Sequence, residues 1–149
     1  MIAEKARIAA AALTRRLVSV TVEGVSMEPA FQDGDQVLVI RRRRPRPGQV
    51  VVVESPFGKQ GWREPPLPSR AAPSLVAARR WMIKRVVALP GDTVPRGLGL
   101  ANVSDERVPA GMVVLLGDNP SSSFDSREFG YFPLVRLLGS VSLVSAVPR

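Results

Sequence analysis

Proline and glycine interrupt this sequence so often that many short strands are favoured over a bundle of long helices. The 149 residues include 14 Pro and 12 Gly, and both residue types mark turns and end regular elements. Apolar residues make up 45% of the chain, which is enough for one domain of ordinary size with a buried core. The sequence therefore predicts a mainly β fold in which several short antiparallel strands follow a short N-terminal helix.

Alternating residues and runs of β-branched or apolar residues locate the strands. Val18, Val20 and Val22 alternate with polar residues in the first of them. Further strands are predicted at 36–40, 49–54, 81–89, 112–116 and, as one or two strands, 134–147. The segment 55–80 lacks periodicity and is rich in Pro and Arg, so we expect a surface insertion or mobile loop there. A polar loop is predicted over 117–130.

Residues 1–16 are predicted to form an amphipathic helix or tail ahead of one domain over 17–149. At helical spacing one apolar face is shared by Ile2, Ala6, Ala9, Leu13 and Leu17. The apolar stretch 8–20 is too short to cross a bilayer and is interrupted by two arginines. Such a helix can pack on its own domain or rest on an anionic membrane surface, and both interpretations stay open.

Arginine supplies most of the positive charge. The chain has 21 basic and 13 acidic residues and a formal net charge of +8, which is compatible with binding to nucleic acid or to an anionic membrane. Only 5% of the residues are aromatic, too few for a base-stacking platform, so no specific nucleic acid partner is expected. The arginine run 41–44 is expected just beyond a strand end, in a solvated loop or in contact with an anion or lipid.

The chain contains no His and no Cys, and this excludes several classes of enzyme. There is no disulfide, thiolate nucleophile or zinc knuckle, no Ser-His-Asp triad and no imidazole metal ligand. No metal and no other cofactor are expected. A serine nucleophile would need a different base, and a neutral lysine is the recognised substitute.

Lys84 is a candidate for that base because it lies inside the apolar strand 81–89. On an extended strand, Met82, Lys84 and Val86 share one face. Burial disfavours a charged ammonium and lowers its pKa by up to about 3–5 units, which would give a usable base near neutral pH. Alternatively, Lys84 turns outward or pairs with a carboxylate.

Ser26 is a candidate nucleophile. It follows the first predicted strand in the segment Gly24-Val25-Ser26-Met27-Glu28-Pro29, where its hydroxyl can stand free on a turn. The alternative is that Ser26 only caps a short helical turn.

The polar segment 117–127 contains two carboxylates, Asp118 and Asp125. Paired carboxylates can serve glycoside or metal chemistry, but nothing else in the sequence supports a metal cage. We prefer an ion pair between Asp125 and Arg127, with a serine hydroxyl near the lysine.

Together, three segments resemble the successive motifs of type I signal peptidases. They are Gly24-Val25-Ser26-Met27-Glu28-Pro29, then Lys84-Arg85-Val86-Val87-Ala88-Leu89-Pro90-Gly91-Asp92, then 117–127, in the order typical of the family. The resemblance covers 18–141 apart from 55–80. It implies a signal-peptidase-like β fold and a serine endopeptidase that removes a signal, leader or pro-peptide.

The resemblance also implies roles for individual residues. Ser26 would be the nucleophile and Lys84 the general base of a Ser/Lys dyad. Ser123 matches the serine that orients the lysine, and Asp118, Asp125 and Arg127 match residues that hold the site together. The Ser26 N–H would bind the oxyanion, while Gly24 stands where some relatives carry a side-chain donor. The expected substrate-binding residues are Val25, Met27, Met82 and Ile83.

The partner implied is a protein or peptide with small residues, such as Ala, before the cut. Typical relatives carry membrane-spanning helices before the serine, and only 25 residues precede Ser26 here. A cytoplasmic or peripheral membrane location and a start further upstream both stay open. The alternatives are a maturation protease for one client, such as nickel superoxide dismutase or a secreted peptide precursor, and a non-catalytic peptide-, lipid- or nucleic-acid-binding module. A self-cleaving repressor is disfavoured because its DNA-binding domain has no room before Ser26.

Overall fold

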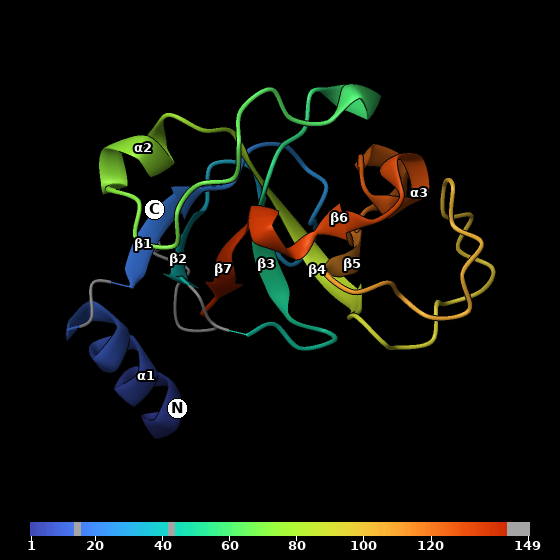
Figure 1. The fold of residues 1–149 in the computed structure, drawn as a ribbon. Coiled ribbons are helices and arrows are strands. Elements are labelled where there is room, and N and C mark those ends of the chain that lie inside the picture. Colours follow the sequence, from blue (N-terminus) through green and yellow to red (C-terminus); the bar gives the residue numbers. More distant parts are fainter. Residues whose placement is uncertain (14–15, 42–43, 143–149) are drawn as a thin grey trace.

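The fold is built on one antiparallel sheet of seven strands (Figure 1). The computed structural model describes residues 1–13, 16–41 and 44–142. The strands are β1 (Leu17–Thr21), β2 (Gln36–Arg41), β3 (Val50–Glu54), β4 (Trp81–Ala88), β5 (Met112–Leu116), β6 (Phe132–Pro133) and β7 (Leu137–Val141). Their order across the curled sheet is β1-β2-β7-β3-β4-β5-β6. The prediction of a mainly β fold is confirmed.

One helix precedes β1, and short helical segments lie between later strands. They are α1 (Ile2–Leu13), α2 (Pro73–Ala77), α3 (Ser126–Phe129) and the 3-10 turns η1 (Gly58–Gln60), η2 (Pro120–Ser122) and η3 (Leu134–Arg136). The polar loop predicted over 117–130 contains two helical segments that were not predicted, η2 and α3, and a capping box of Asp125 and Glu128 starts α3. The last predicted strand begins later than expected, after η3, and residues 143–147 of that prediction lie outside the described part of the chain.

Apolar side chains are buried on both faces of the sheet. Val52 belongs to one buried cluster together with Met27 and Ile83, while its neighbours Val51 and Val53 belong to a second cluster. Successive side chains of a strand point to opposite faces, so β3 has apolar neighbours on either side. This explains why the sequence of β3 is a run of valines rather than an alternation.

The segment 55–80 joins β3 to β4 and is anchored at Glu54, the last residue of β3. The Trp62 indole N–H donates to the Glu54 carbonyl oxygen at 2.9 Å. The two oxygens of the Glu54 carboxylate accept hydrogen bonds from Arg79 at 2.7 Å and from Arg136 at 2.9 Å. Arg79 belongs to the insertion and Arg136 to η3, so one carboxylate joins the insertion to the C-terminal part of the sheet.

Arg41 corrects the expectation for the arginine run. It is the last residue of β2, it is buried, and its guanidinium donates to the Ala71 carbonyl at 2.7 Å. The expectation of a solvated loop is therefore wrong for Arg41, because the insertion covers it. Arg44 is exposed, and Arg42 and Arg43 lie outside the described residues.

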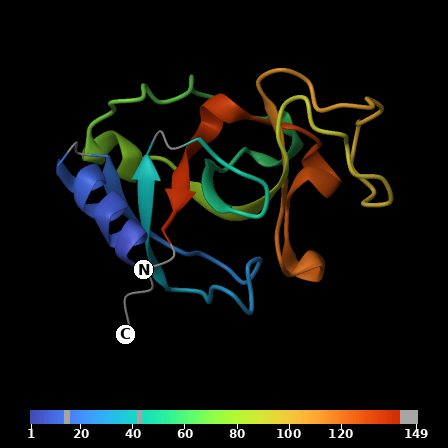
Figure 2. The ribbon, with the colours of Figure 1, turned by 90° about the horizontal axis from the view of Figure 1, so that it is seen from below.

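The helix α1 lies at one end of the sheet, beside β1 and β2, and the 93–107 loop lies at the other (Figures 1 and 2). Helix α1 is tied to the rest of the domain by a hydrogen bond in which the Ser142 hydroxyl donates to Glu4 Oε1 at 2.6 Å. The side chain of Ile2 nevertheless remains 87% exposed. No helix within the described residues is long and apolar enough to cross a membrane.

Candidate active site

The hydroxyl of Ser26 meets the ammonium of Lys84 across 58 positions of sequence. Lys84 Nζ donates to Ser26 Oγ at 2.9 Å. The Lys84 residue is only 2% exposed, so it does not turn outward. Ser26 lies in a turn closed by backbone bonds from Glu28 to Val25 and from Phe31 to Met27, and its hydroxyl is directed to Lys84.

The strand β4 places Lys84 in the middle of the sheet. Val51 of β3 lies directly opposite Lys84 in the antiparallel register. On the same face of β4, Met82 and Val86 pack into the second apolar cluster, as the alternation predicts. Lys84 is therefore buried because the strand that carries it is covered on this face.

Burial lowers the pKa of Lys84 from 10.5 to about 8. The main cause is the loss of water around the ammonium, and the positive charge of Arg127 acts in the same direction. The negative charges of Asp125 and Glu128 oppose the shift. A substantial fraction of Lys84 is thus neutral at mildly alkaline pH and able to accept a proton.

Asp125 is the centre of a hydrogen-bond network beside the dyad. Its fully buried carboxylate accepts the Ser123 hydroxyl at 2.7 Å and the Gly117 N–H at 2.8 Å. It also accepts the N–H and guanidinium of Arg127, which confirms the ion pair. Burial alone would raise the pKa of Asp125, but the hydrogen bonds from Arg127, Gly117 and Ser123 outweigh it and hold that pKa below its usual value.

Ser123 is oriented by Asp125 in this structure. Its hydroxyl proton goes to the carboxylate, and the described residues show no hydrogen bond between Ser123 and Lys84. The expected role of Ser123 in orienting Lys84 stays a prediction.

Asp118 pairs with a residue that the sequence analysis did not single out, Arg85. The guanidinium of Arg85 donates to both oxygens of Asp118, at 2.8 and 2.7 Å. Arg85 follows Lys84 on β4 and therefore points to the opposite side of the strand. The pair ties the loop after β5 to β4 on the side away from the lysine.

Two further residues of the same loop contact the Ser26 turn, and no role was predicted for either. Gly117 lies so close that a Cβ atom on it would overlap the Ser123 hydroxyl and lie 2.8 Å from the Ser26 carbonyl oxygen. Asn119 donates its backbone N–H to the Ser26 carbonyl at 2.8 Å and its side-chain amide to the Val25 carbonyl at 3.0 Å. Both belong to the segment 117–127, and its resemblance to a family motif was the one sequence feature that could have pointed to them.

Comparison with known families decides where this chain belongs. The family model described as "Signal peptidase, peptidase S26" matches residues 3–98 and 95–146. The chain belongs to this signal peptidase family. Its three motif segments thus lie together in a member of the family that they resemble.

Individual signal peptidases are similar over most of the chain. Probable signal peptidase I-2 of Synechocystis sp. is 30% identical over 76% of this chain, and Probable signal peptidase I-1 of the same organism is 29% identical over 76%. Signal peptidase I V of Bacillus subtilis is 27% identical over 81% of both chains. The chain spans 56% and 63% of the length of the two Synechocystis proteins.

The four predicted substrate-binding residues differ in exposure in this signal peptidase family member. Val25 is 39% exposed and Met82 is half-buried against the second cluster. Met27 and Ile83 are buried together in the first cluster. Their contact with substrate stays a prediction.

Gly24, the predicted oxyanion position without a side chain, has a left-handed φ of +82°. Its N–H donates to Asp33 Oδ1 at 2.8 Å. A Cβ at Gly24 would meet no atom within 4 Å, so the space beside the Ser26 turn is open.

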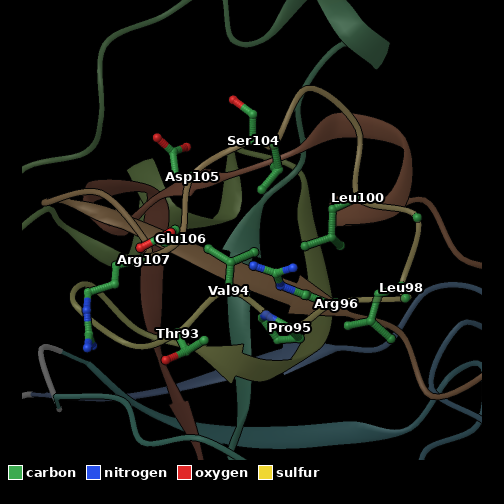
Figure 3. Close-up of a pocket in the computed structure, with 13 residues that line it drawn as sticks. Thr93, Val94, Pro95, Arg96, Leu98, Leu100, Ser104, Asp105, Glu106 and Arg107 are labelled. Atoms are coloured by element: carbon green, nitrogen blue, oxygen red, sulfur yellow. The ribbon is translucent and has the colours of Figure 1, made fainter.

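A separate hollow of about 560 Å³ lies within the loop between β4 and β5 (Figure 3). Its lining residues all belong to 93–107, and the bridge between Thr93 and Arg107 closes the base of this loop. The hollow contains neither member of the dyad. Among the described residues, no group of three or more acidic, His or Cys side chains is arranged to hold a metal ion.

Proposed function

We propose that this chain is a serine endopeptidase that removes a signal, leader or pro-peptide from a protein substrate, with Ser26 as nucleophile and Lys84 as general base. The observation that carries the proposal is the 2.9 Å hydrogen bond between Ser26 Oγ and the buried Lys84 Nζ. A serine next to a lysine with a lowered pKa is an activated nucleophile in a chain without histidine.

The reaction begins with neutral Lys84. It accepts the proton of Ser26 as Oγ attacks the carbonyl carbon of the scissile peptide bond, and the carbonyl oxygen becomes an oxyanion. The Lys84 ammonium then gives its proton to the leaving nitrogen, and the C–N bond breaks. An acyl-enzyme ester on Ser26 remains.

Hydrolysis of the ester uses the same base. Neutral Lys84 takes a proton from a water molecule, and the resulting hydroxide attacks the ester carbon. The proton returns from Lys84 to Ser26 Oγ as the C–O bond breaks and the acid product leaves. Both steps need Lys84 neutral at their start, and the lowered pKa of about 8 supports this role.

The residues around the dyad keep it in place. In this proposal Asp125, held by Arg127 and Ser123, is the anchor of the loop beside Lys84, and Asp118 anchors the same loop through Arg85. The oxyanion is stabilised by the Ser26 N–H, since Gly24 offers no side-chain donor.

The substrate we propose is an extended peptide with small side chains before the cut. The open space at Gly24 and the exposed Val25 are suited to a peptide lying along the Ser26 turn. We further propose that α1, whose Ile2 is exposed and whose Lys5 and Arg7 are basic, makes peripheral contact with an anionic membrane. Residues 17–149 would form the catalytic domain.

The test is cleavage of a peptide panel with Ala at the first and third positions before the cut, from pH 6 to 10. The parent is compared with Ser26→Ala, Lys84→Arg and the exposed control Ser104→Ala. We expect cleavage that increases with pH in the parent and the control and is absent from the two dyad variants. Cleavage by either dyad variant at the parent's rate would exclude the Ser/Lys mechanism, and a parent that cuts no peptide and no membrane-presented precursor would exclude the activity.

A further inference from the structure

Asn119 donates hydrogen bonds to the two backbone carbonyl groups on either side of the Ser26 Cα, those of Val25 and of Ser26 itself. Its own N–H donates to the Ser26 carbonyl oxygen at 2.8 Å. Its side-chain Nδ2 donates to the Val25 carbonyl oxygen at 3.0 Å, across 94 positions of sequence. The peptide planes on either side of the Ser26 Cα are therefore both fixed by one residue of a distant loop.

The backbone N–H of Ser26 itself has no acceptor among the described residues. The Val25–Ser26 peptide bond is trans, so its C=O and N–H point in opposite directions. When Asn119 Nδ2 holds the Val25 oxygen, it fixes the orientation of this peptide plane, and the Ser26 N–H then points within the plane in the direction away from Asn119. A rotation of this peptide plane would break the bond from Asn119 to the Val25 carbonyl and would also change the direction of the Ser26 N–H.

We propose that Asn119 is a positioning residue that orients the Ser26 N–H as the oxyanion donor. The inference rests on the proposed function and adds to it a residue that touches neither the substrate nor the reacting atoms. It matters more in this chain because Gly24 provides no hydroxyl that could share the developing charge with the Ser26 N–H. An oxyanion donor is effective only when it is oriented before the reaction begins.

Asn119 is itself held in place by contacts with neighbouring residues. The Ser121 hydroxyl donates to Asn119 Oδ1 at 3.3 Å, and the Ser122 N–H donates to the Asn119 carbonyl at 3.1 Å. These contacts orient the amide so that its nitrogen faces Val25. The preceding Asp118 is fixed by its two bonds to Arg85, so Asn119 extends from an anchored backbone.

The experiment compares the parent with Asn119→Ala and Asn119→Asp in the full chain. Both variants keep the backbone N–H to Ser26, and both lose the donor to the Val25 carbonyl; Asp has almost the shape of Asn but can only accept. Cleavage is measured at pH 10, where Lys84 is neutral in all forms, so that a new charge at position 119 does not affect the base. Ser104→Ala is the control.

We expect kcat to fall about 10- to 100-fold in both variants with KM within about twofold, since removal of a whole oxyanion donor costs about 10²- to 10³-fold. The midpoint of the pH profile of Asn119→Ala stays at the parent value, because the contacts of Lys84 are unchanged. A loss confined to KM, or parental kinetics in both variants, would overturn the inference.

A second readout isolates the oxyanion. Ser26 Oγ can add to the carbonyl carbon of a peptide aldehyde. The aldehyde oxygen then carries the negative charge, and Lys84 takes the serine proton. The matching peptide alcohol has no carbonyl carbon at this position and cannot react. We expect the ratio of aldehyde to alcohol affinity to fall by the same factor as kcat. An unchanged ratio would assign Asn119 a merely structural role.

The two proposals fail in different ways. A parent that neither cleaves nor binds the aldehyde more tightly than the alcohol would overturn the proposed function, and this inference with it. A parent that does both, with variants that behave like it, would overturn the inference alone. If Asn119→Ala does not fold, Asn119→Asp gives the same comparison.

Discussion

The backbone of Gly117 passes so close to Ser26 that a methyl group on it would lie 2.8 Å from the Ser26 carbonyl oxygen. The same methyl group would overlap the hydroxyl of Ser123. A glycine is thus needed where the loop after β5 crosses the nucleophile, for reasons of space and not of backbone angle.

We therefore expect Gly117→Ala to lower kcat/KM at least about 100-fold, because the loop must move and displace Ser26 from Lys84. The overpacking should also cost about 1–3 kcal/mol of unfolding free energy. Peptide cleavage and urea unfolding measure the two effects, with Ser104→Ala as the control. Parental activity in a folded Gly117→Ala would mean that the loop is not constrained by Ser26.

The pH dependence of cleavage should report Lys84. Because its pKa is lowered to about 8, kcat/KM should rise with pH, with a midpoint near pH 8 and a plateau above it. Asp125→Asn removes the negative charge that opposes this lowering, so the midpoint of the variant should move to lower pH. Initial rates across pH 6 to 10 give both midpoints, and a shift to higher pH would contradict the assignment of the charges.

Lys84 should also destabilise the fold at neutral pH. Its pKa is lower in the folded chain than in the unfolded chain, so between pH 8 and 10.5 the unfolded state binds more protons and stability rises with pH. Below pH 8 Lys84 is charged in both the folded and the unfolded chain, so the full loss of stability from burying its charge remains. We expect Lys84→Met to be inactive but more stable than the parent at pH 7, by about 1–3 kcal/mol.

The difference between Lys84→Met and the parent should shrink as the pH rises from 8 to 10.5. Urea unfolding at several pH values measures it, and subtraction cancels the other titrating groups. A difference that does not change over this range would show that Lys84 is not buried as described.

Glu54 should be important for stability without serving the dyad. Its carboxylate side chain is 8% exposed and pairs with Arg79 and Arg136, which are 14% and 10% exposed. Glu54→Ala leaves both guanidiniums without this partner and should cost about 3–5 kcal/mol, as for other broken buried pairs. Glu64→Ala is the matched control, since that carboxylate is 69% exposed, and it should cost less than about 1 kcal/mol. Equal losses in the two variants would contradict the network.

The positions of the strands could be predicted because alternation and runs of β-branched or apolar residues are local properties of the chain. Val18, Val20 and Val22 alternate within one strand, and the face shared by Met82, Lys84 and Val86 follows from the pleat alone. The pairing of Ser26 with Lys84 was expected from the resemblance of the motifs, not from spacing. Nothing local in the sequence relates two residues that are 58 positions apart.

The helices of the loop after β5 and the anchoring of the insertion could not be predicted in the same way. Asp125 belongs to a segment of turn-forming residues. The capping box that starts α3 differs from an open loop by only a few hydrogen bonds, so the sequence does not distinguish the two. Trp62 and Arg79 lie in a segment without periodicity, and Glu54, their common partner, belongs to a strand. Their contacts depend on the path of the insertion back over the sheet.

By itself, the sequence determined the mainly β architecture, the order of the motifs and the need for a base other than histidine. Only the tertiary structure decided that Arg85 is the partner of Asp118, that Gly117 must lack a side chain and that Asn119 holds the carbonyls around Ser26. The physical reason is that side-chain alternation is set by neighbouring residues, whereas these contacts are set by the pairing of β4 with β5 and by the packing of Met27, next to Ser26, against Ile83 of β4. Together they bring segments from both halves of the chain within hydrogen-bond distance.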